Sequence, residues 1–142
     1  MPQDQYPSDP QRRREGLEMM SKVYGWEASD GPGDFFGMTV EHLFGEVWTR
    51  EGLSMRDRRL LLVGFMVGAG LDDVLPLQLG AALGNEELTD DELREITVFL
   101  THYCGWPRGA KVNTAAEKAI AAAAKERDQA RERRSQEQQQ QQ

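Results

Sequence analysis

The stretch "HLFGEVWTREGLSMRDRRLLL", residues 42–62, joins the end of one amphipathic segment to the start of a strongly apolar one. Ser54, followed three residues later by Asp57, has the spacing of a capping box, which is typical of the first turn of a helix. The following run, residues 60–67, is apolar on nearly every side, and such a helix is normally buried. Four arginines, at positions 50, 56, 58 and 59, gather at the start of this helix. The stretch therefore predicts a helical protein with cations at one end of a buried helix.

Helix start and stop signals continue on both sides of this stretch. Asp9 is a candidate N-cap before Pro10, and Gly25 is a candidate stop. Thr89 is a candidate cap further along, and Gly105 with Pro107 closes the helix that follows it. No segment shows the two-residue alternation of a β-strand. We expect an all-α fold, a single-domain helical bundle with helices over residues 10–24, 35–48, 55–69, 73–83, 90–104 and 107–124.

The ends of the chain differ in composition from its middle. A chain of 142 residues can form one domain with a sizeable core. The sequence predicts a flexible N-terminus over residues 1–9, a helical domain over residues 10–124, and a charged helical extension over residues 125–142 that ends in a disordered glutamine-rich tail.

Composition excludes several classes of function. The net charge of −7 argues against nucleic acid as the main partner, because phosphate binding requires basic surface. Neither a membrane-spanning run nor a secretory signal is evident, so we expect a cytoplasmic protein without a membrane partner. Cys104 is the single cysteine, and His42 and His102 are the only histidines. These residues form no recognisable metal-ligand pattern, so no metal site is expected.

Several motifs, in this order along the chain, resemble the gamma-carboxymuconolactone decarboxylase family. "RRREGLEMMSKVYG" is similar to the opening helix of that family, and the pattern E-x-x-x-G-x-x-W-x-R-x-G-L-x-x-R-x-R-x-L-L follows from Glu41 onward. "L-x-L-x-L-x-x-A-L", residues 75–83, resembles its central helix, and "DDELREITVFLTHYCGWP" resembles a later segment. The resemblance covers roughly residues 11–120, and the tryptophan–arginine stretch is its most specific part.

The resemblance implies a fold related to the alkylhydroperoxidase D-like proteins and a homo-oligomer, typically a hexamer built as a trimer of dimers. The implied activity is the loss of carbon dioxide from 4-carboxymuconolactone in the beta-ketoadipate pathway of aromatic catabolism, without a cofactor. The redox branch of that superfamily uses a Cys-x-x-Cys motif. Residues 68–82 contain no cysteine, and a thiol peroxidase needs a resolving cysteine, so we do not expect that mechanism.

One position departs from the family pattern. Where the resemblance implies a histidine in the central helix, this chain has Gln78. Glutamine donates and accepts hydrogen bonds but cannot act as an acid or base near neutral pH. This departure leaves open a paralogue that kept the fold and changed its chemistry, acting on a related lactone or carbonyl compound.

The implied reaction predicts a set of site residues. A substrate carboxylate needs cations, and arginine binds carboxylate bidentately, so we expect Arg50 and Arg58 to bind substrate, with Trp48 beside them. Charge develops on the lactone carbonyl as carbon dioxide leaves, and Gln78 is a candidate donor to that oxygen. Glu46 and His102 are candidate proton carriers.

Each of these residues also has a structural interpretation. The arginines could form salt bridges, and Glu46 with Arg50 has the i,i+4 spacing of a helical ion pair. Trp48 could be a packing anchor, Gln78 a core polar residue, and His102 a surface residue. A non-catalytic oligomeric binding protein that reaches a partner through its polar tail remains an alternative function.

Overall fold

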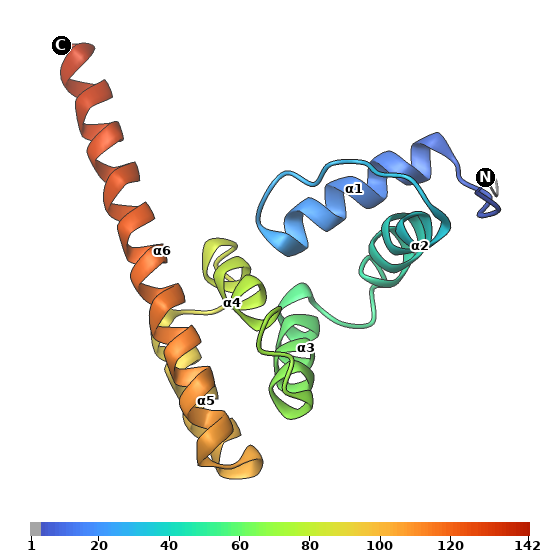
Figure 1. Cartoon of the computed structure of the whole chain (residues 1–142). Helices are drawn as coiled ribbons and strands as arrows, with labels where there is room; N and C mark the ends of the chain where they lie inside the picture. Colours follow the sequence, from blue (N-terminus) through green and yellow to red (C-terminus); the bar gives the residue numbers. More distant parts are fainter. Residues whose placement is uncertain (1–3) are drawn as a thin grey trace. The chain divides into compact units, whose positions relative to one another are not determined.

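The computed structural model describes residues 4–142, which form helices and connecting loops without a β-strand. The prediction of an all-α fold is confirmed. The chain divides after Leu62, inside α3, into two compact units that are described separately below. The elements are α1 (Pro10–Tyr24), α2 (Asp34–Gly37), η1 (Met38–Val47), α3 (Met55–Ala69), α4 (Leu75–Gly84), α5 (Asp90–Cys104) and α6 (Trp106–Gln140) (Figure 1).

Helix α1 begins and ends at the predicted residues. The Asp9 carboxylate accepts hydrogen bonds from the backbone N–H groups of Gln11 and Arg12, at 3.0 and 2.9 Å. Gly25 ends the helix with φ of 78°, a left-handed conformation that glycine adopts without steric cost. Helix α1 packs on η1, and the two backbones approach closely at Gly16, where a Cβ atom would lie 2.1 Å from the carbonyl oxygen of Val40.

The second predicted helix, residues 35–48, is a short α-helix followed by a π-helix. In η1 the backbone bonds run from residue i to i+5, and the N–H of Trp48 donates to the carbonyl of Leu43 at 2.9 Å. The wider turn places Val40, Glu41 and Phe44 on the buried face and leaves Leu43 and Val47 exposed. An α-helix over the predicted range would group Leu43 and Val47 with Val40 and Phe44 on one apolar face, because these residues are spaced three and four apart.

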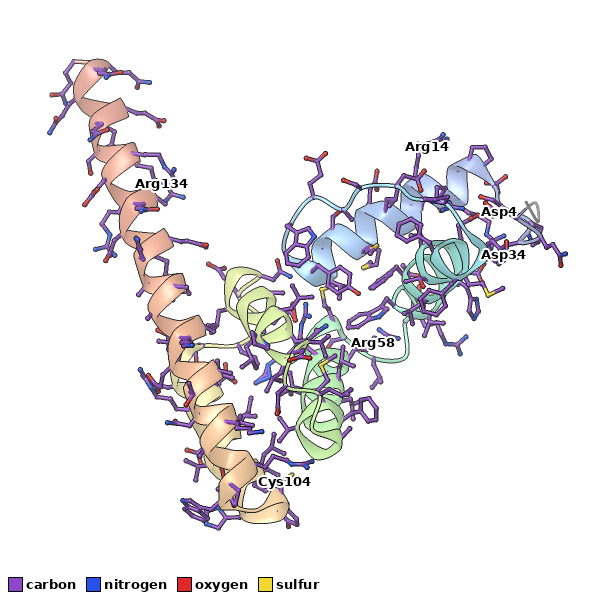
Figure 2. The ribbon with its side chains drawn as sticks, in the orientation of Figure 1. Asp4, Arg14, Asp34, Arg58, Cys104 and Arg134 are labelled. Carbon is purple, nitrogen blue, oxygen red and sulfur yellow. The ribbon has the colours of Figure 1, made fainter. Side chains whose placement is uncertain are left out.

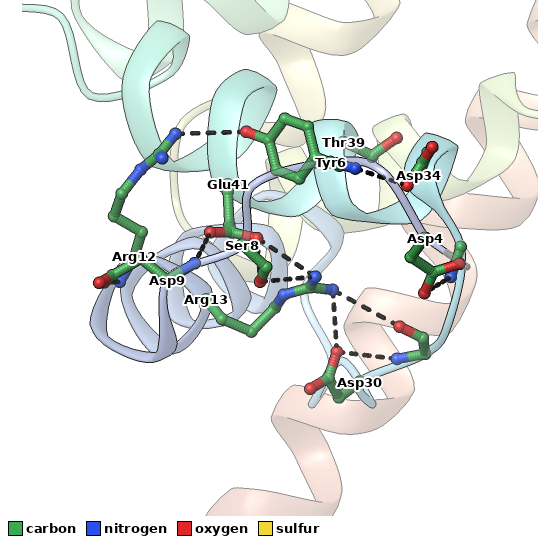
Figure 3. A network of polar contacts seen from close by, with 12 residues as sticks. Asp4, Tyr6, Ser8, Asp9, Arg12, Arg13, Asp30, Asp34, Thr39 and Glu41 are labelled. Atoms are coloured by element: carbon green, nitrogen blue, oxygen red, sulfur yellow. Dashed lines mark hydrogen bonds and ion pairs between the residues drawn. The ribbon is translucent and has the colours of Figure 1, made fainter.

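A polar network ties the start of the chain to η1 (Figure 3). The Glu41 carboxylate is fully buried. It accepts hydrogen bonds from the Ser8 hydroxyl at 2.7 Å and the Asp9 N–H at 2.8 Å, and it pairs with Arg13 at 3.2 Å. The N–H of Tyr6 donates to Asp34. Of the predicted flexible segment, residues 1–3 lie outside the described part of the chain, whereas residues 6, 8 and 9 hold these bonds.

The network makes stability depend on pH. Burial alone would raise the pKa of Glu41, but the bonds from Asp9 and Ser8 and the charges of Arg13 and Arg12 outweigh it and lower that pKa. A carboxyl group with a lowered folded-state pKa stabilises the fold above its unfolded-state pKa of about 4.3, and this contribution disappears as the pH falls through the folded-state value.

We expect Glu41→Gln to reduce the free energy of unfolding by about 2 kcal/mol at pH 7, because the amide loses the charge that Arg13 pairs with. Urea denaturation at pH 7 and at a pH below the folded-state pKa of Glu41 measures the effect. The difference from wild type should shrink at the lower pH, because the wild-type carboxylate loses its charge as the pH falls through its folded-state pKa. Glu18→Gln, on the exposed face of α1, is the matched control and should be neutral. An equal difference at both pH values would contradict the assignment.

In the second unit, α5 and α6 lie side by side and antiparallel (Figure 1). Helix α5 begins with the predicted cap Thr89, which forms a capping box with Glu92. Arg94 pairs with Glu117 at 3.0 Å, and Asp90 pairs with Arg127 at 3.0 Å. Helix α4 also packs on α6. The buried apolar side chains of this unit include Leu75, Leu79, Leu93, Val112, Ala116 and Ile120.

Helix α6 continues far beyond its last buried residue. It runs to Gln140 and therefore includes the segment for which the sequence predicted a disordered tail. Alternating charges and good helix formers favour this continuation in water. Figure 2 shows the polar side chains of this part, with Arg134 labelled. Within residues 4–142, no helix combines the length and apolar character that a membrane crossing requires.

Helix α3 corrects one prediction. Its apolar run was expected to be buried on every side. Val63 and Val67 are buried, but Leu61 and Phe65 are 64% and 62% exposed. The prediction was wrong for the single chain, because apolar composition shows that a surface favours burial without showing what covers it.

Candidate functional site

The arginine-rich loop before α3 is held by its own side chains. The hydroxyl of Ser54 accepts a hydrogen bond from the N–H of Asp57 at 3.0 Å, which confirms Ser54 as the cap of the predicted helix. The guanidinium of Arg58 donates to the backbone carbonyls of Leu53 and Arg50, the latter at 2.6 Å. Figure 2 labels Arg58 in this region. The side chain predicted to bind substrate therefore has two donors engaged with the loop that precedes it.

Arg50 differs from the other arginines of the cluster. Its side chain is exposed, and within residues 4–142 its guanidinium has no hydrogen-bond or ion-pair partner. It lies a few residues before the N-terminus of α3, where unpaired N–H groups and the helix dipole favour anions. Arg50 is therefore available to an anionic ligand, as its predicted role requires.

Arg59 is structural. Its side chain is fully buried, and it donates to the carbonyl of Val23 at 2.6 Å. Its guanidinium carbon lies 5.9 Å from the ring centre of Trp48, within the range of a cation–π contact. Arg56 is half-buried and also has an interaction partner. Of the four arginines, Arg59 is buried, Arg58 binds the loop backbone and Arg56 has a partner. The remaining guanidinium, that of Arg50, has no partner among the described residues.

Trp48 belongs to a chain of aromatic contacts. Its ring stacks on Phe44 with centroids 6.3 Å apart, and Phe44 in turn contacts the edge of Tyr24 at 5.4 Å. With Arg59 on it as well, much of the Trp48 ring is used in packing. This geometry agrees with the interpretation of Trp48 as a packing anchor, and its contact with substrate stays a prediction.

Glu46 is paired, but not with Arg50. Its carboxylate accepts a hydrogen bond from Arg12 at 2.6 Å and lies 2.9 Å from Nδ1 of His42. The expected i,i+4 pair with Arg50 is wrong. The hydrogen bond with His42, against a smaller opposing effect of burial, and the interactions with Arg12 lower the pKa of Glu46. A carboxyl group with a lowered pKa is ionised at neutral pH and is poorly suited to donate a proton.

Gln78 and His102 belong to the second unit. Gln78 lies on α4, is 4% exposed and has an interaction partner. His102 is exposed on α5. Its Nδ1 lies 2.7 Å from the carbonyl oxygen of Val98, and its ring meets the edge of Trp106 with centroids 5.4 Å apart. Because a carbonyl only accepts, Nδ1 carries the proton, and Nε2 of the neutral ring is left with its lone pair.

A groove between α5 and α6 adjoins His102. Its volume is about 380 Å³, and apolar atoms form most of its walls. Thr97 and Thr101, which line it, donate their hydroxyls to the carbonyls of Leu93 and Thr97 and so present little polar character. The full lining is Thr97, Val98, Thr101, His102, Trp106, Gly109, Ala110 and Asn113. His102 is therefore placed as a proton acceptor beside an apolar groove.

Two important residues were not singled out from the sequence. Glu41 opens the motif quoted above, and Arg59 stands in the arginine cluster, yet neither was predicted as a buried charge. A signal for Glu41 was present, because it follows Val40 and precedes Phe44 on an apolar face. No group of three or more histidine, cysteine or carboxylate side chains within residues 4–142 is arranged to hold a metal ion.

Comparisons with known proteins give a consistent result. Residues 33–126 match the model of the carboxymuconolactone decarboxylase family. The chain is 32% identical over 108 residues to 4-carboxymuconolactone decarboxylase of Acinetobacter baylyi, covering 70% of this chain and 80% of that protein. It is 31% identical over 83 residues to nitrosuccinic acid decarboxylase of Metarhizium robertsii, covering 58% of this chain and 57% of that protein. The match includes η1 from end to end, α3, α4, α5 and the first part of α6.

Proposed function

Because this chain belongs to the carboxymuconolactone decarboxylase family, we propose that it removes carbon dioxide from a small dicarboxylic acid that carries its own electron-withdrawing group. The leading substrate is 4-carboxymuconolactone, which would place the protein in aromatic catabolism through the beta-ketoadipate pathway. The observation that carries the proposal is the exposed guanidinium of Arg50, in the loop that precedes α3, which has no partner among residues 4–142.

The substrates named for the two relatives share two chemical features. Each has two carboxylates, one that can leave and one that stays. Each also has a group that accepts the electron pair left behind by carbon dioxide, a lactone carbonyl conjugated to an alkene in one and a nitro group in the other. Since the electron sink is part of the substrate, the proposed reaction needs no cofactor.

The chain offers a group for each remaining task. Arg50 binds the carboxylate that stays, through a charge-assisted bidentate contact. Donors facing the oxygen where charge develops lower the barrier, and the buried amide of Gln78 is the candidate donor. For the proton that carbon later takes up, Glu46 is poorly suited, because its lowered pKa keeps that carboxylate ionised. His102 is the candidate carrier: its Nε2 first takes up a proton from solvent and then passes it to carbon.

We also propose that the protein acts as a homo-oligomer, for which the family resemblance suggests a hexamer. Side chains that favour burial are exposed on the single chain, on α3 and around the end of α5. Exposed apolar side chains of this kind are typical of interfaces between protein subunits. The residues are Leu61, Phe65, Val98, Phe99, Tyr103 and Trp106.

Turnover assays test the function directly. The purified, assembled protein is mixed with 4-carboxymuconolactone and, separately, with nitrosuccinate, while ultraviolet absorbance and released carbon dioxide are followed. Carbon dioxide released from either compound supports the proposal and identifies the electron sink that the site accepts. Correctly folded protein that releases none from both compounds would refute it.

A paralogue with changed chemistry is the second candidate function, favoured by the buried glutamine at position 78. Under this candidate the wild-type protein binds a related lactone without releasing carbon dioxide, and Gln78→His gains the missing acid–base group. Under the leading proposal, wild type is already active, and Gln78→His should lower kcat by about tenfold, because the imidazole N–H lies at a different position from the amide N–H proposed to face the oxyanion. Steady-state kinetics of both proteins on 4-carboxymuconolactone distinguish the two.

A further inference from the structure

The loop between η1 and α3 carries Arg50 but has few contacts of its own. Glu51, Gly52 and Leu53 are exposed, and a Cβ atom added to Gly52 would meet nothing within 4 Å. The N–H of Arg50 donates to the carbonyl of Val47 through a long bond of 3.3 Å. Local backbone bonds alone therefore hold this segment weakly.

The side chain of Arg58 holds this loop with two hydrogen bonds. Its Nη1 donates to the carbonyl of Leu53 and its Nη2 to the carbonyl of Arg50, so a single guanidinium joins two carbonyls three residues apart. Arg58 itself sits on the first turn of α3, where its N–H bonds to the carbonyl of Ser54 at 3.1 Å. The planar fork of the guanidinium thus fixes the loop against a helix.

We propose that Arg58 is a positioning residue that acts through Arg50. By holding the carbonyl of Arg50, it fixes the backbone from which the free guanidinium of that residue extends toward a substrate carboxylate. This inference rests on the proposed function, and it differs from the prediction that Arg58 binds substrate itself. Lysine in place of Arg58 keeps the charge but lacks the fork, so charge and geometry can be separated.

A double-mutant cycle tests the coupling. Wild type, Arg58→Met, Arg50→Ala and the double variant are assayed with the substrate that wild type turns over. We expect Arg58→Met to raise KM about tenfold with kcat changed less than threefold, and Arg58→Lys to raise KM nearly as much. In the Arg50→Ala background, Arg58→Met should add less than a twofold further loss. Arg14→Met, which removes an exposed arginine of α1, is the control and should change neither constant.

Two outcomes of the cycle would overturn the proposal. If the losses from Arg50→Ala and Arg58→Met multiply in the double variant, Arg58 contacts substrate directly. If Arg58→Met leaves KM unchanged, the hydrogen bonds from Arg58 to the loop carbonyls do not affect substrate binding.

Hydrogen exchange provides a readout that does not depend on turnover. In Arg58→Met, amide exchange of residues 49–53 should accelerate at least tenfold, while exchange in α1 and α5 stays as in wild type. Unchanged exchange in residues 49–53 would overturn the proposal that Arg58 positions the loop. Absence of turnover in wild type would refute the proposed function, and hydrogen exchange would still decide the role of Arg58.

Discussion

The Gly16→Ala variant should lose most of the stability of its first unit. An alanine Cβ at this position would lie 2.1 Å from the carbonyl oxygen of Val40, 2.7 Å from the carbonyl carbon and 2.8 Å from Cγ1. Two of these atoms belong to the backbone and cannot rotate away, so α1 must separate from η1. Overpacking in a core costs about 1–3 kcal/mol and sometimes more, and we expect at least the upper value.

Thermal and urea unfolding measure this loss. A drop of about 3 kcal/mol corresponds to a decrease in Tm of roughly 10 °C for a protein of this size. Gly80→Ala is the matched control, because a Cβ atom at position 80 of α4 would meet nothing within 4 Å. That variant should be neutral or slightly stabilised through helix propensity. A Gly16→Ala protein as stable as wild type would show that α1 and η1 do not pack as described.

Replacing Arg50 with alanine should lower kcat/KM by about 100-fold. A hydrogen-bonded contact to a charged group is worth about 1.5–3 kcal/mol, and each 1.4 kcal/mol corresponds to a factor of ten. The carboxylate that stays on the substrate is bound alike in the ground state and the transition state. We therefore expect the loss mainly in KM, with kcat nearly preserved.

Steady-state kinetics at two salt concentrations check this expectation. The KM of wild type should rise with ionic strength, because salt screens an exposed cation, whereas the KM of Arg50→Ala should depend less on salt. Arg14→Ala removes the same charge from α1 and should behave as wild type. If Arg50→Ala keeps the wild-type KM, the substrate carboxylate binds elsewhere. The exposed guanidinium of Arg50 would then no longer support the proposed function.

Local signals in the sequence were sufficient to predict much of the fold. Asp9, Thr89 and Ser54 act as caps at the predicted positions, because capping depends on atoms only two or three residues apart. The π-helical geometry of η1 could not be predicted in this way. Apolar residues spaced three and four apart fit an α-helix, and no local signal distinguishes the i+5 bonds of η1, the element that packs on α1.

The contacts of the candidate site could not be predicted from local sequence signals. Residue type correctly identified a guanidinium-rich loop, but the partner of each guanidinium lies far away in the sequence or on the backbone. Arg59 donates to Val23, 36 residues earlier, and Glu46 pairs with Arg12 rather than with its helical neighbour Arg50. Spacing predicts neighbours along one helix, whereas these contacts depend on how different elements pack together.

The long α6 also has a practical consequence for attaching labels and fusion partners. From Arg127, the residue that pairs with Asp90, the helix continues to Gln140. At 1.5 Å per residue, this adds a stiff spacer of about 20 Å. A fluorophore or fused protein at the carboxyl end would therefore be held away from the folded part of the second unit. A fusion at the amino end would instead join the chain a few residues before the network that secures Tyr6, Ser8 and Asp9.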